Sequence, residues 1–191
     1  MPRITFNNTS VDVLIDEDSL ATEYVQERTQ RRSSSGKIQT ISQHGIQEMS
    51  FSAILTEAVY RSLVAWWAWA RQGKVFAFAF DSTKTGNTAL DDTAAAAQKV
   101  IPLTGTGDFT AGDYCLIRAA DNDNEFEIVE IASISAGVSV TAVSNLVYDY
   151  ASGDVFRHHD YWPDVVCLDD TFNPPKKGGT RRHVFKFAEK L

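Results

Sequence analysis

Only one stretch of this sequence has the periodicity of an α-helix, and strand-like segments lie on both sides of it. Residues 56–73 read TEAVYRSLVAWWAWARQG. Thr56 is placed to cap the helix and Gly73 to end it, so we expect a helix over about residues 57–72. Its apolar stripe is formed by Val59, Leu63, Trp66, Trp67 and Ala70. A chain with one helical segment among so many strand-like ones is expected to be mainly β.

The segments beside the helix alternate apolar and polar residues with a period of two. ITFNN (4–8) and VDVLID (11–16) open the chain, QEMSFSAIL (47–55) precedes the helix, and VFAFAFD (75–81) follows it. This alternation is typical of strands that bury one face. The C-terminal segment RRHVFKFAEKL (181–191) has the same texture. We therefore expect these segments to form a β-sandwich or barrel that the helix flanks.

Three tryptophans within four positions of the helix raise the question of a ligand site, because indoles stack on sugars and bases. Trp66 and Trp67 flank the apolar stripe, and the strand expected at 75–81 presents phenylalanines on one face. We expect both indoles to fill the core between helix and sheet. Trp69 lies off the edge of the stripe, and it is the indole that we expect to meet a partner.

The net charge of the chain is concentrated in one segment. Residues 83–157 hold eleven acidic and four basic residues, and the rest of the chain is balanced, so this segment carries the whole net charge of −7. Within it, five strand-like runs are separated by turn sequences rich in glycine, aspartate and asparagine. We predict a small acidic all-β barrel or sandwich at residues 98–157, preceded by a linker at 83–97. This domain is inserted into a main β domain of residues 1–82 and 158–191.

A polar hairpin is predicted at about residues 22–42. Two long strands with few apolar residues are joined there by the loop RRSSSGK (31–37). A strand pair of this composition buries little by itself, so it is either solvated or paired with a neighbouring subunit. Together with Trp69, its basic residues are therefore our candidates for subunit contact: Arg28, Arg31, Arg32 and Lys37.

No motif of catalysis or cofactor binding stands out in the sequence. His158, His159 and Asp160 form the best candidate for a metal site, but adjacent strand residues point to opposite faces and do not easily share one ion. DNDNEFE (121–127) resembles the start of a calcium loop, yet it lacks the glycine and the distal glutamate of such loops and favours a hairpin turn. We therefore expect no enzyme activity, no cofactor and no metal.

Composition argues against several classes of partner. No run approaches the ~20 uncharged apolar residues of a membrane helix, and the N-terminus lacks a signal-peptide pattern, so we expect neither membrane insertion nor secretion. An acidic domain does not favour polyanions, so specific nucleic-acid binding is not expected. Cys115 and Cys167 lie in separate apolar runs. Two buried thiols in a reducing compartment are the favoured interpretation, and one disulfide is the alternative.

The order of these parts resembles structural proteins of long-tailed bacteriophage tails, the family of tail-tube and distal-tail (baseplate) proteins. The N-terminal strand pair, the basic hairpin around RRSSSGK, the strand QEMSFSAIL, the helix and the strand VFAFAFD follow one another as they do in that family. The stretch from GDYCLIRAA to GDVF (112–156) also resembles small β modules that decorate such proteins. The resemblance covers nearly the whole chain and rests on order and texture.

This resemblance implies a tail-tube-like β domain that assembles as a homomeric ring, by analogy a hexamer, around the tail channel. The hairpin would pair with the next subunit, where its bases would meet acidic residues. The ring would have a tube-initiating, distal-tail or tube-adaptor role in a virion tail assembled in the bacterial cytoplasm, in contact with other tail or baseplate proteins. The family implies no catalytic residues.

Two alternatives remain open from the sequence. The first is a carbohydrate-binding module for host recognition, for which Tyr148, Tyr150 and Phe156 of the acidic domain would supply exposed aromatic rings. The second is a small hydrolase, which would need a catalytic triad assembled in space from distant residues.

Overall fold

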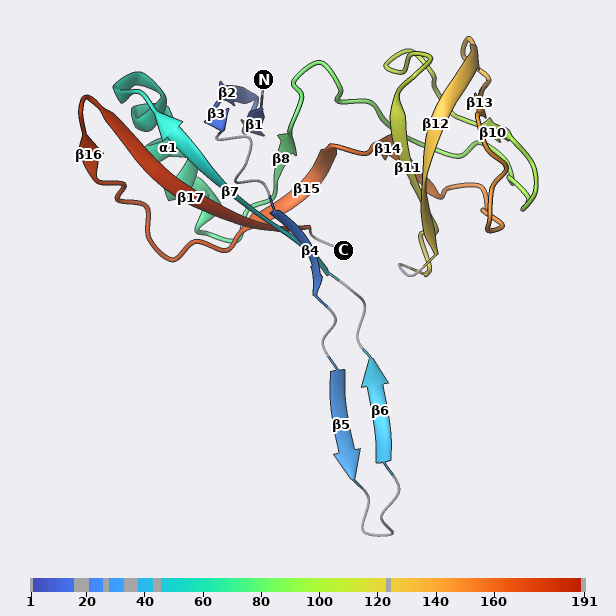
Figure 1. Ribbon diagram of the computed structural model, residues 1–191, viewed down its shortest axis with the longest axis horizontal. Coiled ribbons are helices and arrows are strands. Elements are labelled where there is room, and N and C mark those ends of the chain that lie inside the picture. The colour runs from blue at the N-terminus through green and yellow to red at the C-terminus, as the bar shows by residue number, and fades with distance from the viewer. Residues whose placement is uncertain are drawn as a thin grey trace. The chain divides into compact units, whose positions relative to one another are not determined.

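The computed structural model describes residues 2–15, 21–25, 28–32, 38–42, 46–122 and 125–189 (Figure 1). As expected, the chain is mainly β, and the described residues contain one α-helix. By its internal contacts the chain divides into two compact units. The main unit is formed by Ile4–Ala77 and Asp164–Leu191, and the inserted unit by Phe78–Pro163 together with Met1–Arg3.

The largest sheet has nine strands and curls on itself. Hydrogen bonding connects them in the order β2-β1-β8-β15-β17-β7-β3, with β4 also beside β7 and β16 beside β17. Only Val13 separates β2 from β3 in sequence, although these strands stand at opposite ends of the order, so the sheet must bend to bring its ends together. The strands are β1 (Arg3–Phe6), β2 (Thr9–Asp12), β3 (Leu14–Ile15), β4 (Ala21–Val25), β7 (Ile46–Leu55), β8 (Phe76–Ala79), β15 (Tyr161–Cys167), β16 (Lys176–Lys177) and β17 (Thr180–Glu189).

The interior of this curled sheet follows from the alternation of side chains along its two longest strands. β7 and β17 pair antiparallel from Arg181↔Leu55 to Ala188↔Glu48. Alternate residues of a strand share one face, so each strand sends one set of apolar side chains inward. The buried set comprises Met49, Phe51, Ala53 and Leu55 of β7, Phe185 and Phe187 of β17, Val11 of β2, Ile15 of β3, and Val13 between these two strands.

The helix α1 (Glu57–Ala70) covers one side of this core (Figure 1). The Thr56 hydroxyl accepts a hydrogen bond from the Val59 amide at 3.4 Å, which confirms the expected cap, and the helix ends two residues before the expected position. α1 packs against β2, β7 and β17. Trp66 is fully buried, with its ring 5.1 Å from that of Phe76, so it is a core residue as expected.

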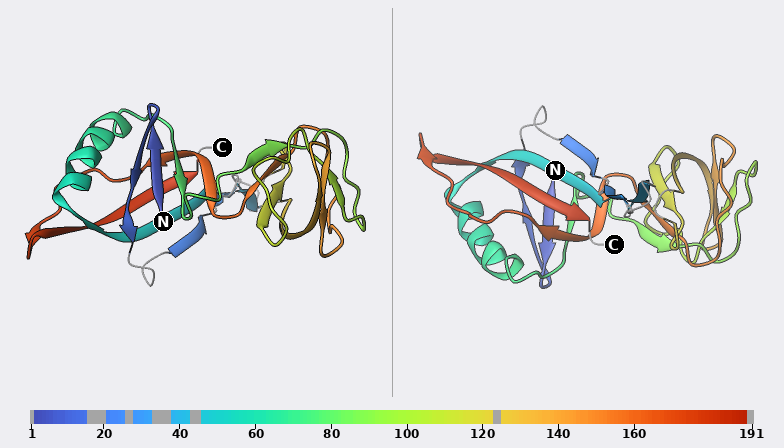
Figure 2. Two further views of the ribbon diagram at one scale, coloured as in Figure 1. Left: turned by 90° about the horizontal axis from the view of Figure 1, so that it is seen from above. Right: turned by 90° about the horizontal axis from the view of Figure 1, so that it is seen from below.

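The inserted unit is a second, smaller barrel. Its sheet has the order β10-β13-β12-β11-β14-β9. The two end strands are joined beyond their ends by a bridge between Leu90 and Leu103, so the sheet closes around a common interior (Figure 2). The strands are β9 (Asn87–Ala89), β10 (Val100–Pro102), β11 (Tyr114–Arg118), β12 (Phe126–Ser135), β13 (Ser139–Ala142) and β14 (Val155–His158).

The linker predicted at residues 83–97 is wrong, because this stretch belongs to the barrel. β9 pairs with β14, and Leu90 and Ala94 are buried in the barrel core. The barrel cannot close without a strand between β14 and β10, and β9 supplies it. β9 has too few residues to show an alternation of apolar and polar side chains in the sequence. The buried residues that hold this stretch in the barrel, Leu90 and Ala94, come after the strand.

The predicted hairpin at 22–42 is divided between two sheets. β4 pairs with β7 from Ala21↔Ser50 to Val25↔Ile46, so its first part belongs to the large sheet. β5 (Arg28–Arg32) and β6 (Ile38–Ser42) then form a two-stranded sheet of their own. Two residues separate β4 from β5 and three separate β6 from β7, so the pairing register shifts by one residue between the two pairs.

Candidate functional site

The predicted contact residues of the hairpin lie mainly in β5. Arg28, Arg31 and Arg32 are placed opposite Ser42, Gln39 and Ile38 of β6. Lys37 falls in the loop 33–37, outside the described residues. Within the described part of the chain, β5 and β6 pair only with each other. Because an isolated two-stranded sheet is at best marginally stable in water, this pair is a candidate for docking onto another surface.

The other two tryptophans of α1 are half-buried, and both make contacts within the chain. The ring of Trp69 lies 5.9 Å from that of Phe6 in β1, so the predicted partner residue has a neighbour in its own subunit. The indole N–H of Trp67 donates to the Asp169 carbonyl at 3.4 Å, and its ring stacks on Phe172. Trp67 therefore lies at the margin of the core rather than at its centre.

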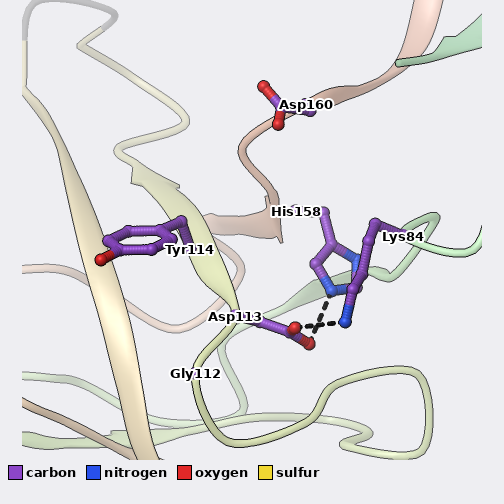
Figure 3. A pocket seen from close by; sticks show the side chains of 6 residues that line it. All are labelled: Lys84, Gly112, Asp113, Tyr114, His158 and Asp160. Carbon is purple, nitrogen blue, oxygen red and sulfur yellow. Dashed lines mark hydrogen bonds and ion pairs between the residues drawn. The ribbon is translucent and has the colours of Figure 1, made fainter. Parts of the chain in front are cut away.

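A pocket of about 170 Å³ in the inserted unit is lined by a cluster of ionisable side chains (Figure 3). The His158 ring and the Lys84 amine both point at the Asp113 carboxylate, whereas the Tyr114 ring points away from it. Asp113 directly precedes β11 and His158 ends β14, and these strands pair with Cys115 opposite His158. Lys84 comes from the segment before β9, so three separate segments meet here. The pocket is lined by Lys84, Gly112, Asp113, Tyr114, His158 and Asp160.

The Asp113 carboxylate accepts hydrogen bonds on both of its oxygens. Oδ1 accepts from the Lys84 amine, while Oδ2 accepts from the Thr110 amide at 2.7 Å, the Thr110 hydroxyl at 2.9 Å and His158 Nε2 at 3.0 Å. Burial alone raises the pKa of this carboxyl, but the hydrogen bonds from Lys84, His158 and Thr110 outweigh it and hold the pKa well below its usual range. Asp113 is therefore a carboxylate across the physiological range.

His158 has no ring nitrogen left for chemistry. The Gly86 amide donates to Nδ1 at 2.7 Å, so this nitrogen carries no proton. The proton is on Nε2, which donates it to Asp113. The side chain is 2% exposed, and its ring lies 4.9 Å from that of Phe109. The unprotonated nitrogen of this buried ring is occupied by a backbone amide, so it is not open to a substrate or a metal ion, and the Asp113 cluster (Asp113, His158, Lys84 and Thr110) acts as a clamp between segments.

The neighbouring His159 lies in the turn that follows β14 and contacts a different residue. Its Nδ1 lies 2.8 Å from Asp160 Oδ1, and both side chains are exposed. The described residues hold no group of three or more histidine, cysteine or acidic side chains arranged to bind a metal ion. Residues 121–125 of the stretch 121–127 lie between β11 and β12 in sequence, and Phe126 and Glu127 begin β12; the Ala119 amide donates to the Glu125 carbonyl at 3.0 Å. Asp123 and Asn124 of this stretch lie outside the described residues.

Both cysteines are free thiols; Cys115 is buried as expected, whereas Cys167 is only half-buried. Burial raises the pKa of Cys115 to about 12 and that of Cys167 to about 11, so neither is an activated nucleophile. Cys167 Sγ lies 4.0 Å from Asp169, whose carboxylate is 3.4 Å from His183 Nε2. A protonated thiol that faces a carboxylate does not form the thiolate–imidazole pair of cysteine enzymes.

The aromatic residues that prompted the carbohydrate alternative are mostly in the core. Tyr150 is 2% exposed and Phe156 is fully buried, so the expectation that they are exposed is wrong. They line the barrel interior because alternation and the Ala94–Tyr150 bridge turn them inward. Tyr148 alone of the three is exposed. A single ring does not make a stacking platform for a sugar.

Sequence reasoning singled out His158 but missed the other members of the Asp113 cluster. Lys84, Thr110 and Asp113 are separated by ordinary loop residues, and no spacing rule connects them to His158. Compared with protein-family models and with curated proteins, the sequence matches none of them. Among the residues that the structure describes, no helix has the length and apolar character needed to cross a membrane.

Proposed function

We propose that this protein is a structural component of a bacteriophage tail or baseplate, and that it forms a homomeric ring through its β5–β6 hairpin. The order of its parts suggests the family, and the main unit is compatible with this assignment because it combines a curled sheet with one flanking helix. The ring is by analogy a hexamer and would contact other tail proteins. No catalytic step is part of this proposal.

One observation carries the proposal: β5 and β6 form a sheet by themselves. Their ten residues include only Ile38 and Ile41 as apolar residues, and three arginines stand in β5. Two polar strands without a third strand or a helix gain little from folding alone. Contact with a neighbouring subunit would stabilise the pair, and repetition around a closed ring would give every hairpin the same contact.

The test is the mass of the assembly formed by the wild type and by Arg31→Glu/Arg32→Glu. We expect the wild type to form a ring-sized species in light scattering at low and moderate salt, with annular particles in electron micrographs. The double variant should remain monomeric, because reversed charges on the hairpin would repel the acidic surface that receives it. Its circular dichroism should match that of the wild type.

The matched control is Arg61→Glu/Lys74→Glu, which changes the net charge by the same amount outside the hairpin. Arg61 is 79% exposed on α1, and Lys74 is exposed just after the helix. This control should assemble like the wild type. Assembly of the hairpin variant at wild-type concentrations, or a wild type that stays monomeric at every concentration, would contradict the proposed function.

A further inference from the structure

The outer face of the inserted barrel carries an exposed apolar patch built around one carboxylate. We call it the Glu130 patch, formed by Tyr114 of β11, Ile128 and Glu130 of β12, and Val143 just after β13. Tyr114 is 59% exposed, Ile128 is 49% exposed and Val143 is 45% exposed. Their strand neighbours Cys115, Val129 and Ala142 are buried, so the patch is the outward half of the same alternation.

The register of the strands makes the patch contiguous. Tyr114 is directly opposite Glu130, and its hydroxyl donates to Glu130 Oε2 at 3.2 Å. On the other side of β12, the Val143 amide donates to the Glu130 carbonyl at 2.8 Å. Ile128 lies two residues along β12, on the same face as Glu130. Glu130 is therefore surrounded by apolar side chains on three neighbouring positions.

The chemistry of the patch specifies what it would bind. The barrel is closed, so a partner cannot add a strand to its edge and must bind through side chains on its outer face. A carboxylate beside an exposed tyrosine ring suits an arginine. The planar guanidinium of an arginine can form paired hydrogen bonds with the carboxylate and stack on the ring. The stretch 83–157, from which the patch is built, has a net charge of −7, and this charge favours a partner with several bases.

We propose that the Glu130 patch is the receiving surface for the β5–β6 hairpin of a second copy of this chain. This inference rests on the proposed function and names the surface that the hairpin meets. The hairpin stretch 28–37 contains Arg28, Arg31, Arg32 and Lys37 and no acidic residue. The stretch 83–157, which includes the patch, carries eleven acidic residues against four basic ones. The basic hairpin and the acidic stretch that carries the patch are thus complementary in charge.

A charge-exchange experiment tests the contact between copies. Glu130→Lys alone should raise the concentration needed for assembly at least tenfold, because the hairpin arginines would meet a like charge. Arg31→Glu/Arg32→Glu alone should not assemble, because its hairpin glutamates would meet the like charge of Glu130. An equimolar mixture of the two proteins should assemble again, since each hairpin then finds a patch of opposite charge on the other protein. Light scattering of the two variants and of their mixture measures this.

Two matched controls separate the patch from general surface effects. Asp108→Lys makes the same change of charge at an exposed loop position of the inserted unit, and it should assemble like the wild type. Val143→Asp should weaken assembly, whereas Val138→Asp should leave it unchanged, although Val138 is 60% exposed in the same unit. Thermal unfolding of each variant checks that the fold is kept.

The outcomes distinguish this inference from the proposed function. If Arg31→Glu/Arg32→Glu abolishes the ring while Glu130→Lys and Val143→Asp assemble normally, the hairpin docks elsewhere, and this inference alone is overturned. Failure of the mixture to assemble also overturns it. If neither the hairpin variant nor the patch variants affect the ring, both the inference and the proposed hairpin contact fall. Recovery in the mixture, with both controls unaffected, supports the inference.

Discussion

At the scale of single residues, the inserted barrel depends on a buried polar clamp and on the one glycine that makes room for it. Gly86 donates its amide to His158, and a Cβ at this position would lie 2.8 Å from the Phe109 ring and 2.9 Å from His158 Nδ1. Both neighbours are buried and held by other contacts, so neither has space to move away. The glycine is needed here for close approach, not for an unusual backbone angle.

Gly86→Ala should therefore destabilise the inserted unit by about 1–3 kcal/mol, as overpacked core substitutions do. Thermal and urea unfolding, followed by circular dichroism, would measure the change. Gly107→Ala is the control, because a Cβ at Gly107 meets no atom within 4 Å and should change stability by no more than about 0.5 kcal/mol. Equal stability of the two variants would refute the packing argument.

Asp113 should make stability depend on pH in the acid range. Because the folded-state pKa of its carboxyl is held below the ordinary value of 3.8, its contribution is present above about pH 4. That contribution is lost as the pH falls further, toward the folded-state pKa. At neutral pH, Asp113→Asn should lower the free energy of unfolding by about 2–4 kcal/mol, since it breaks a buried hydrogen-bonded network.

The difference between wild type and Asp113→Asn should shrink steadily as the pH is lowered below about 4. Urea unfolding at a series of pH values measures this difference directly. Asp108→Asn, at an exposed position, is the control and should change stability by less than about 0.5 kcal/mol. A constant difference between wild type and Asp113→Asn over the whole acid range would show that folding does not lower the pKa of Asp113.

At the scale of elements, the predicted helices and strands agree with the observed ones where a few neighbouring residues determine the structure. Thr56 caps α1 because its hydroxyl satisfies an amide that has no partner within the helix, and Gly73 follows with a φ of 73°. The five strand-like runs of the acidic segment are all strands. β9 was not foreseen, because a three-residue strand with exposed or half-buried side chains has no alternation to detect.

Thr56→Ala should cost about 1 kcal/mol of stability in the main unit, because it removes the side-chain acceptor for the Val59 amide. Tryptophan fluorescence during urea unfolding reports on this unit, since α1 carries three of the four tryptophans. Ser62→Ala, in the middle of the helix, is the matched control and should be neutral or slightly stabilising. Equal losses in the two variants would mean that the cap contributes nothing.

At the scale of the whole molecule, the decisive feature is the place where the inserted unit leaves and rejoins the main sheet. The division between the units falls inside β8 and inside β15. These strands are neighbours in the sheet although more than eighty residues separate them in sequence. An insertion whose two ends emerge from adjacent strands leaves the pairing of the host sheet intact.

The sequence by itself determined the elements whose causes are local. Alternation along the strands, the helical stripe around Trp66 and the cap at Thr56 each depend on residues within a few positions of one another. The charge break at 83–157 likewise indicated a separate acidic unit, because surface composition is visible without contacts. These signals were enough for the fold class.

Only the tertiary structure decided the features that join distant segments. The curl of the large sheet, the closure of the inserted one, the role of β9 and the burial of Tyr150 and Phe156 depend on which strands become neighbours. The Asp113 cluster and the Glu130 patch also combine residues from strands that meet by pairing register. No short-range pattern encodes such pairing, since it is set by the energy of the whole core.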